Sequence, residues 1–196
     1  MVNLNKDFWK NKRVLITGHT GFKGSWLSII LKELGCKVYG YSLEPNKSQK
    51  IFSLFDIQNS IDKSVFGNIC EYKRLKNFCL SIKPNIIINL AAQSLVIDGY
   101  KDPLNNFRSN ILGTINILDI SDNIKSTKFF LNVTTDKVYL IENKLKLLNE
   151  ESKLFAHDPY GISKVCSDLL TQSYNYFNKN KNLKFIVARS GNVIGG

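Results

Sequence analysis

The sequence predicts an α/β protein in which helices cover both faces of a doubly wound parallel sheet. Apolar runs of strand length alternate along the chain with longer segments of helical period. Three glycines at intervals of three residues join the first apolar run to the first helical segment. The run at 85–92 is apolar without alternation, which is typical of a strand buried on both faces. At 196 residues, the chain is long enough to bury the core of one such domain.

The first half of the chain predicts one side of this sheet. The apolar run "RVLIT" is the first strand, and "SWLSIILKELG" is a helix closed by Gly35. A loop that holds Pro45 follows the second strand. We expect strands at 13–17, 37–42, 64–68 and 85–92, helices at 25–35 and 71–82, and a short helix near 51–55.

The second half continues the same alternation. We expect helices at 103–121 and 159–178, and strands at 128–135 and 184–190. The helix at 159 begins with proline, which is favoured at the first helical position. Because ligands of doubly wound sheets bind at the carboxyl ends of the strands, the candidate site is expected there.

The composition argues against several classes of protein. The longest apolar stretch, at 86–92, is far too short to cross a bilayer, and the amino terminus lacks the apolar core of a signal peptide. We therefore expect a cytoplasmic protein without a membrane segment. Four cysteines are widely spread with no metal-binding spacing, so we expect no metal site. They are Cys36, Cys70, Cys79 and Cys166.

The net charge of +11 raises the possibility of nucleic-acid binding. Only four arginines are present, at positions 13, 74, 108 and 189, and the lysines are scattered. Phosphate and base recognition favours the planar guanidinium group over the ammonium group of lysine. We therefore interpret the charge as a solvated surface, with no nucleic-acid partner.

The glycine triplet Gly18, Gly21 and Gly24 predicts a phosphate cradle. In this position the first glycine permits a tight turn, the second lets a diphosphate approach the backbone, and the third lets the helix pack closely on the strand. The amino end of the helix then offers free N–H groups to the anion. The segment "TGHTGFKG" resembles the extended short-chain dehydrogenase/reductase family, whose members have a Rossmann fold and bind a nicotinamide dinucleotide.

The resemblance implies a set of cofactor-binding residues. The coenzyme is expected to be NAD, although NADP is not excluded, because Ser42 ends the second strand where an acidic residue usually holds the ribose. Glu44 and Lys47 follow it. The implied contacts are Gly18, Thr20, Gly21, Phe22, Lys23, Gly24, Ser42, Asn68, Ile69, Leu90, Ala91, Ala92, Tyr160 and Lys164.

The segment "DPYGISK" predicts a catalytic pair. Tyr160 and Lys164 are four residues apart in a helix, so their side chains share one face. We expect the ammonium group to lower the pKa of the phenol, as a base working near neutral pH requires. By resemblance, Thr135 at the end of the preceding strand hydrogen-bonds the reacting sugar hydroxyl beside the tyrosine.

The segment "TTDK" at 134–137 sharpens the resemblance. Sugar-nucleotide 4,6-dehydratases carry Thr-Asp-Glu here, and the CDP-glucose 4,6-dehydratases carry Thr-Asp-Lys. "GHTGFKGSWL", "NLAAQSLV" and "RSGNVIGG" are similar to the same group. The implied reaction converts CDP-glucose to CDP-4-keto-6-deoxyglucose by oxidation at C4, loss of water across C5 and C6, and return of the hydride to C6.

This resemblance also implies residue roles and partners. Tyr160 takes the proton of the C4 hydroxyl, Asp136 protonates the departing C6 hydroxyl, and Lys137 abstracts the C5 proton. The substrate contacts are expected to be Gln93, Ser94, Arg189 and Asn192. A homodimer is expected through the helices near 104–120 and 160–177.

The chain departs from the family in two places. It ends at Gly196, so we expect residues 1–196 to form the NAD(P)-binding domain without the following substrate-binding domain, and to be poor in catalysis. The loop at 140–157 lacks the tryptophan and glycine residues usual in the group, which leaves the nucleotide base open. A non-catalytic dinucleotide-binding or subunit-interaction module, and a different epimerase or dehydratase of this family, remain as alternatives.

Overall fold

The computed structural model describes residues 5–46, 49–141 and 147–195. One six-stranded sheet has the order β3-β2-β1-β4-β5-β6, and all of its strand pairs are parallel. This order confirms the doubly wound topology, whose reversal point lies between β1 and β4. The strands are β1 (Arg13–Thr17), β2 (Lys37–Ser42), β3 (Lys63–Phe66), β4 (Ile86–Asn89), β5 (Phe129–Thr135) and β6 (Lys184–Ser190).

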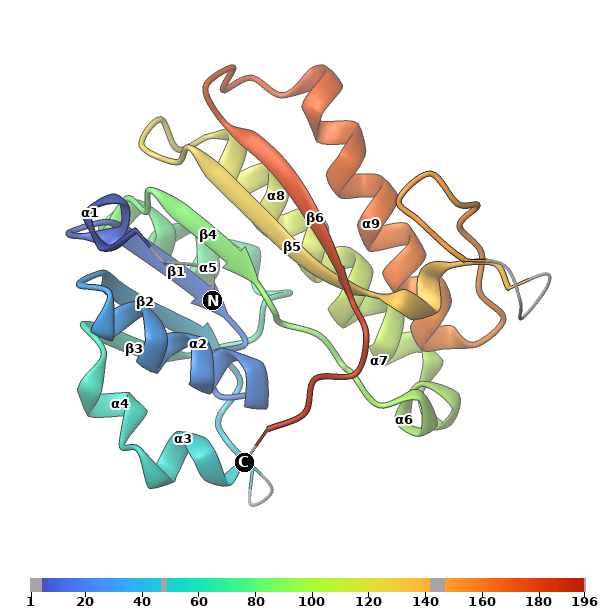
Figure 1. Ribbon diagram of the computed structural model, residues 1–196, viewed down its shortest axis with the longest axis horizontal. Coiled ribbons are helices and arrows are strands. Elements are labelled where there is room, and N and C mark those ends of the chain that lie inside the picture. Colours follow the sequence, from blue (N-terminus) through green and yellow to red (C-terminus); the bar gives the residue numbers. More distant parts are fainter. Residues whose placement is uncertain (1–4, 47–48, 142–146, 196) are drawn as a thin grey trace.

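Helices cover both faces of this sheet (Figure 1). On one face, α2 (Phe22–Glu33), α3 (Lys50–Leu54) and α4 (Ile57–Ser60) pack over β1 to β3. On the other, α5 (Tyr72–Ile82), α8 (Gly113–Asp122) and α9 (Pro159–Phe177) pack behind the strands. The remaining helices are α1 (Lys6–Trp9), α6 (Val96–Lys101) and α7 (Pro103–Phe107), with a π-helical segment η1 (Arg108–Leu112) and a 3₁₀ turn η2 (Asp136–Val138).

Two apolar clusters form the core, one on each face of the sheet. Alternate residues of β1 divide between them: Leu15 packs toward α5 and α8, whereas Val14 and Ile16 pack toward α2. The residues of β4 divide in the same way, with Ile87 on the face covered by α5 and α8, and Ile86 and Ile88 on the face covered by α2. Burial on both faces explains why these strands read as uninterrupted apolar runs.

The structure corrects several predicted boundaries. The first long helix begins at Phe22 instead of 25, because Gly21 is its extended amino cap. The strand predicted at 85–92 ends at Asn89, and the helix predicted at 103–121 is interrupted by the π-helical segment η1. The helices α1, α4 and α6 were not predicted, because each is too short to display a helical period.

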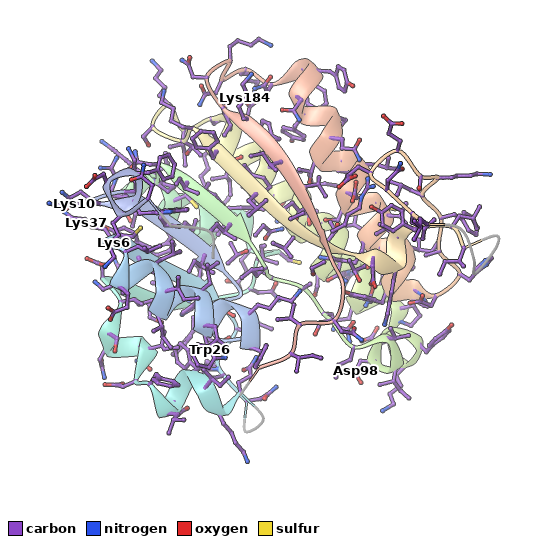
Figure 2. The ribbon with its side chains drawn as sticks, viewed as in Figure 1. Lys6, Lys10, Trp26, Lys37, Asp98 and Lys184 are labelled. Carbon is purple, nitrogen blue, oxygen red and sulfur yellow. The ribbon has the colours of Figure 1, made fainter. Side chains whose placement is uncertain are left out.

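The labelled lysines lie away from the carboxyl edge of the sheet (Figure 2). Lys37 begins β2 and Lys184 begins β6, so both are at the amino edge, and Lys6 and Lys10 lie near Lys37. The four cysteines are free thiols. In the described part of the chain, no helix combines the length and apolar character that crossing a membrane requires.

Candidate active site

The turn after β1 brings three backbone segments into close approach. Gly18 has a φ of +75°, and a Cβ atom there would lie 2.8 Å from the Ala91 amide nitrogen. A Cβ atom on Gly24 would lie 2.2 Å from the Gly18 carbonyl oxygen, so no larger residue fits. Gly21 differs, because a Cβ atom there would meet only the Gly18 oxygen, at 3.4 Å. The first and third glycines therefore serve packing, and the second faces open space.

The amino end of α2 is suited to bind an anion. Gly21 is its cap, and no side chain of the described residues hydrogen-bonds to this end of the helix. The first N–H groups of a helix have no intrahelical acceptor and carry a partial positive charge. This end therefore supplies free donors beside the turn that Gly18 makes.

A cavity of about 430 Å³ opens at the carboxyl edge of the sheet, next to these donors. We call it the carboxyl-edge cavity. Every residue predicted to bind the cofactor lines it, and so do Gln93 and Ser94. Sequence reasoning assigned no ligand contact to other lining residues, of which Thr134 and Val193 lie within quoted motifs: Tyr41, Leu43, Gln49, Gly67, Asn105, Ser109, Val133, Thr134 and Val193.

The end of the cavity beside β2 is lined by hydroxyl and amide groups. The Ser42 and Thr20 hydroxyls are 2.7 Å apart, and the Thr20 hydroxyl also donates to the Leu43 carbonyl at 3.2 Å. The Asn68 side-chain carbonyl already accepts the Cys70 N–H at 2.9 Å, which leaves it one lone pair for a ligand. Glu44 is exposed and does not line the cavity, and Lys47 lies outside the described residues.

The predicted catalytic group gathers where β5 meets the start of α9. Asp158 caps α9 by accepting the Gly161 N–H at 2.9 Å, and Pro159 takes the first helical position. This start places Tyr160 in the lining of the cavity, next to Thr135, which does not line it. The Thr135 hydroxyl donates to the Asp136 carboxylate at 3.1 Å. One turn after Tyr160, the Lys164 ammonium donates to the Val133 carbonyl at 2.9 Å.

The electrostatics of this group differ from the expectation for the tyrosine. Burial raises the pKa of Tyr160, and the hydrogen bond with Thr135 only partly opposes this increase. The expected lowering by Lys164 is therefore wrong for this structure, because the phenol is desolvated and the ammonium is bound to Val133. Burial lowers the pKa of Lys164 to about 8, with a further decrease from the charge of Lys23.

Asp136 and Lys137 lie beside this group, and both are exposed. They belong to η2, the turn that follows β5, and neither lines the carboxyl-edge cavity. The Lys137 ammonium is 6.0 Å from the centre of the Tyr160 ring. The structure therefore brings Lys137 next to the phenol, but it does not bury this lysine as a lysine base requires.

Asn110, on the π-helical segment η1, fixes the loop that follows β4. Its side-chain amide accepts the Gln93 N–H at 2.8 Å and donates to the Gln93 carbonyl at 3.0 Å. It also donates to the Ser163 hydroxyl on α9 at 2.8 Å. Asn110 is itself buried, so its role is structural. Through it, the loop that carries Gln93 and Ser94 is tied to the helix that carries Tyr160.

Two of the predicted substrate contacts, Arg189 and Asn192, lie outside the lining of the cavity. Arg189 forms a partly buried ion pair with Asp168, in which Nε donates at 2.9 Å. It also donates to the Tyr139 hydroxyl and the Glu150 carbonyl. Its guanidinium group links β6 to α9, and it does not line the cavity, so a substrate contact is not supported. Asn192 is exposed beyond β6 and does not line the cavity either.

A family model matches most of the chain, including the segments that form this site. The model of the family described as GDP-mannose 4,6 dehydratase matches residues 15–193. The chain belongs to that family. Members of the GDP-mannose 4,6-dehydratase family are extended short-chain dehydrogenases/reductases, so the resemblance stated from the glycine and tyrosine motifs is confirmed.

Individual relatives agree with this assignment. The chain is 35% identical over 199 residues to the CDP-glucose 4,6-dehydratase of Salmonella typhimurium, covering 98% of this chain and 55% of the relative. It is 33% identical to the dTDP-D-glucose 4,6-dehydratase of Dictyostelium discoideum, covering 97% of this chain and 46% of the relative. The chain thus spans about half the length of these curated relatives.

A solved structure shares the fold. The UDP-glucose 4-epimerase of Brucella ovis, crystallised in complex with NAD, superposes with a TM-score of 0.76 at 22% identity. The match covers 91% of this chain and 51% of the epimerase. At this identity the similarity shows the fold alone.

Proposed function

We propose that this chain is the dinucleotide-binding part of an NAD-dependent sugar-nucleotide 4,6-dehydratase. One observation carries the proposal: a single cavity joins the glycine turn and free N–H groups of α2 to the phenol of Tyr160. A diphosphate-bearing coenzyme bound against α2 extends along this cavity toward the Tyr160 hydroxyl and the Lys164 ammonium.

The residues around the cavity fit such a coenzyme. The absence of room for a Cβ atom at Gly18 and Gly24, and the open space at Gly21, suit a diphosphate held by backbone N–H groups. Leu90, Ala91 and Ala92 supply the wall at the end of β4. Bound NAD supplies a hydride acceptor for sugar C4 and, once reduced, a hydride donor for C6.

NADP remains an alternative coenzyme. Among the described residues that line the cavity, none is a carboxylate. Ser42 stands where an acidic side chain would repel a ribose 2′-phosphate. We propose NAD on the basis of the family resemblance, and the comparison of NAD with NADP in the titration below tests this choice.

The side chains near Tyr160 suggest how protons move in the reaction. In this proposal the Tyr160 phenolate accepts the proton of the sugar C4 hydroxyl, and the Thr135 hydroxyl orients both groups. The Lys164 ammonium, which also lines the cavity, has further N–H donors besides the one bound to Val133, and these donors bind the ligand beside the phenol. Asp136 protonates the departing C6 hydroxyl, and Lys137 removes the C5 proton.

The proposed substrate is CDP-glucose. It is supported by the Thr135-Asp136-Lys137 sequence and by the 35% identity to the CDP-glucose 4,6-dehydratase of Salmonella typhimurium. The product is CDP-4-keto-6-deoxyglucose. Of the predicted substrate contacts, we retain Gln93 and Ser94, which line the cavity.

A homodimer through α8 and α9 is proposed as well. Large apolar side chains are exposed along these segments: Leu112 at 44% in η1, directly before α8, and Leu169 at 51% and Phe177 at 60% in α9. Burial of such a surface between two copies is favourable. Sedimentation analysis is expected to give twice the chain mass for the wild type and a shift to monomer for Leu169→Glu.

A non-catalytic dinucleotide-binding module is the second candidate, favoured by the exposure of Asp136 and Lys137. Titration of the protein with NAD, NADP and CDP-glucose in thermal melts tests both candidates. A ligand that binds only the folded state increases the free energy of unfolding, by about 2.7 kcal/mol at a ligand concentration of 100 times Kd. This increase raises Tm. Both candidates require a shift with NAD, and the absence of any shift with NAD or NADP contradicts both.

A further inference from the structure

Lys23 lies in the wall of the carboxyl-edge cavity and connects α2 to the end of β6. It is the second residue of α2, directly after the glycine turn, and it lines the cavity. Its ammonium group donates to the Ser190 hydroxyl, at the end of β6, over 2.8 Å. The chain after β6 runs back toward the first turn of α2, where a Cβ atom on Gly195 would lie 3.4 Å from the Phe22 ring (Figure 1).

The ammonium of Lys23 is poorly compensated where it lies. Its hydrogen-bond partner is a neutral hydroxyl, and burial lowers its pKa, an effect that the charge of Asp136 opposes. The charge of Lys23 in turn lowers the pKa of Lys164, so the two cations repel each other. Both line a cavity in which no carboxylate is found among the described lining residues. Such an arrangement is stabilised by an anionic ligand.

The position of Lys23 identifies the part of the ligand that it meets. Its own backbone N–H belongs to the first turn of α2, beside the uncapped end that faces the open space at Gly21. A side chain on this turn is within reach of any group held by the N–H donors of the same turn. In the dinucleotide of the proposed function, that group is the diphosphate.

We propose that the Lys23 side chain binds the diphosphate of the dinucleotide, exchanging the Ser190 hydroxyl for a phosphate oxygen. This inference rests on the proposed function. Lys23 then supplies an ionic contact in addition to the backbone donors of the glycine turn. A Lys23→Arg variant retains the positive charge and is therefore expected to keep the contact.

The test is the dissociation constant of NAD, ADP-ribose and adenosine for wild type, Lys23→Met and Lys23→Gln, measured by calorimetry. A hydrogen bond to a charged group predicts a loss of about 10-fold to 100-fold in affinity for NAD and ADP-ribose. Adenosine, which lacks the diphosphate, is expected to bind all three proteins equally. The dependence of NAD affinity on salt is expected to be weaker in both variants, because one ionic contact is lost.

Two matched variants separate the contact from a structural role. Ser190→Ala removes the partner of Lys23 and keeps its charge, so NAD affinity is expected to be unchanged or higher. Lys32→Met removes an exposed cation from the same helix, paired with Asp62, and is expected to leave NAD affinity unchanged. Affinities of Lys23→Met and Lys23→Gln within two-fold of wild type overturn this proposal. A wild type that binds neither NAD nor ADP-ribose overturns the proposed function itself.

Discussion

Lys164 is a cation that the fold buries at a cost. Its side chain is only 5% exposed, and its ammonium group has the Val133 carbonyl as hydrogen-bond partner. Burial lowers its pKa from 10.5 to about 8. Below pH 8 the folded state must keep a buried charge, whereas the unfolded state keeps the same charge in water. The residue therefore lowers the stability of the protein at neutral pH.

Replacement of Lys164 by methionine is expected to stabilise the free protein at pH 7. The gain is roughly 1–3 kcal/mol, because the desolvated charge is removed. Between pH 8 and 10.5 the wild type gains stability as Lys164 loses its proton, so the advantage of the variant shrinks over this range. Urea unfolding at pH 7 and pH 10 measures the difference. A variant that is less stable than wild type at pH 7 contradicts this account.

His19 is a second buried basic group, within the glycine turn. Its ring is fully buried between Phe52 and Phe66, and its Nε2 hydrogen-bonds the Ser64 hydroxyl at 2.7 Å. A Cβ atom on Gly40 would lie 2.2 Å from this ring, so Gly40 makes room for it. Burial lowers the pKa of His19 from 6.5 to about 4, so the folded protein holds a neutral imidazole at neutral pH.

This burial predicts a loss of stability in mild acid. Between pH 6.5 and about 4 the unfolded state binds a proton that the folded state does not, so stability falls as pH falls. The contribution of His19 amounts to about 3 kcal/mol once pH reaches 4. The difference in unfolding free energy between pH 7 and pH 4.5 is expected to be smaller for His19→Asn than for wild type. An equal difference in the two proteins excludes His19 as the source.

At the scale of the element, the turn between β1 and α2 uses its glycines for different purposes. Gly24 allows α2 to pack on the Gly18 carbonyl, whereas Gly21 leaves space beside the free N–H groups. Gly21 has a φ of −74°, which any residue adopts without strain. Within this turn, Gly24 is therefore required for the packing of α2, and Gly21 is available for ligand binding.

Gly24→Ala and Gly21→Ala are expected to differ accordingly. In Gly24→Ala the new methyl group meets backbone at 2.2 Å, so α2 must move away from β1, with a loss of more than about 3 kcal/mol in stability. Gly21→Ala is expected to change stability by less than about 1 kcal/mol. It is also expected to weaken NAD binding at least 10-fold, since the methyl group fills the space for the diphosphate. Thermal melts and NAD titrations of both variants test this; equal effects on stability contradict it.

The motifs with fixed spacing were predictable from the sequence because local geometry alone determines them. The turn at Gly18, the pair Tyr160 and Lys164, and the six strands all follow from short-range rules. The role of Arg189 was not predictable, because its partner Asp168 lies 21 residues earlier and the pair forms only when β6 packs beside α9. The π-helical segment η1 likewise depends on the tertiary contacts of Asn110 with Gln93 and Ser163.

At the scale of the whole molecule, a chain of buried side-chain hydrogen bonds connects the strand before the glycine turn to α9. The Thr17 hydroxyl donates to the Asn89 side chain at 2.5 Å, and the Asn89 amide donates to Asn132 at 2.9 Å. The Asn132 amide then donates to the Thr171 hydroxyl on α9 at 2.8 Å. These hydrogen bonds cross β1, β4 and β5, so they hold the two ends of the carboxyl-edge cavity in register.

The face of β5 and β6 that lies on the same side of the sheet as α2 is less well covered than the face against α8 and α9 (Figure 1). Figure 1 shows α2 over β1 and β2, and no helix of the described chain in front of β5 and β6. Apolar side chains are exposed there, with Phe129 at 38% and Ile186 at 45%. Asp136 and Lys137, in the turn after the carboxyl end of β5, are exposed as well. Asp136 and Lys137 are therefore open to water, whereas Lys164, one turn after Tyr160, is buried.

This asymmetry predicts that the 196-residue chain binds coenzyme without completing the proposed reaction. A site open to water does not desolvate Lys137 or hold the sugar in a reactive position. We expect NAD to raise Tm, while incubation with NAD and CDP-glucose yields no CDP-4-keto-6-deoxyglucose above the protein-free background by NMR. The CDP-glucose 4,6-dehydratase of Salmonella typhimurium, of which this chain matches about half the length, is the positive control. Formation of the keto sugar by this chain contradicts the prediction, because the exposed Asp136 and Lys137 would then suffice for the elimination of water.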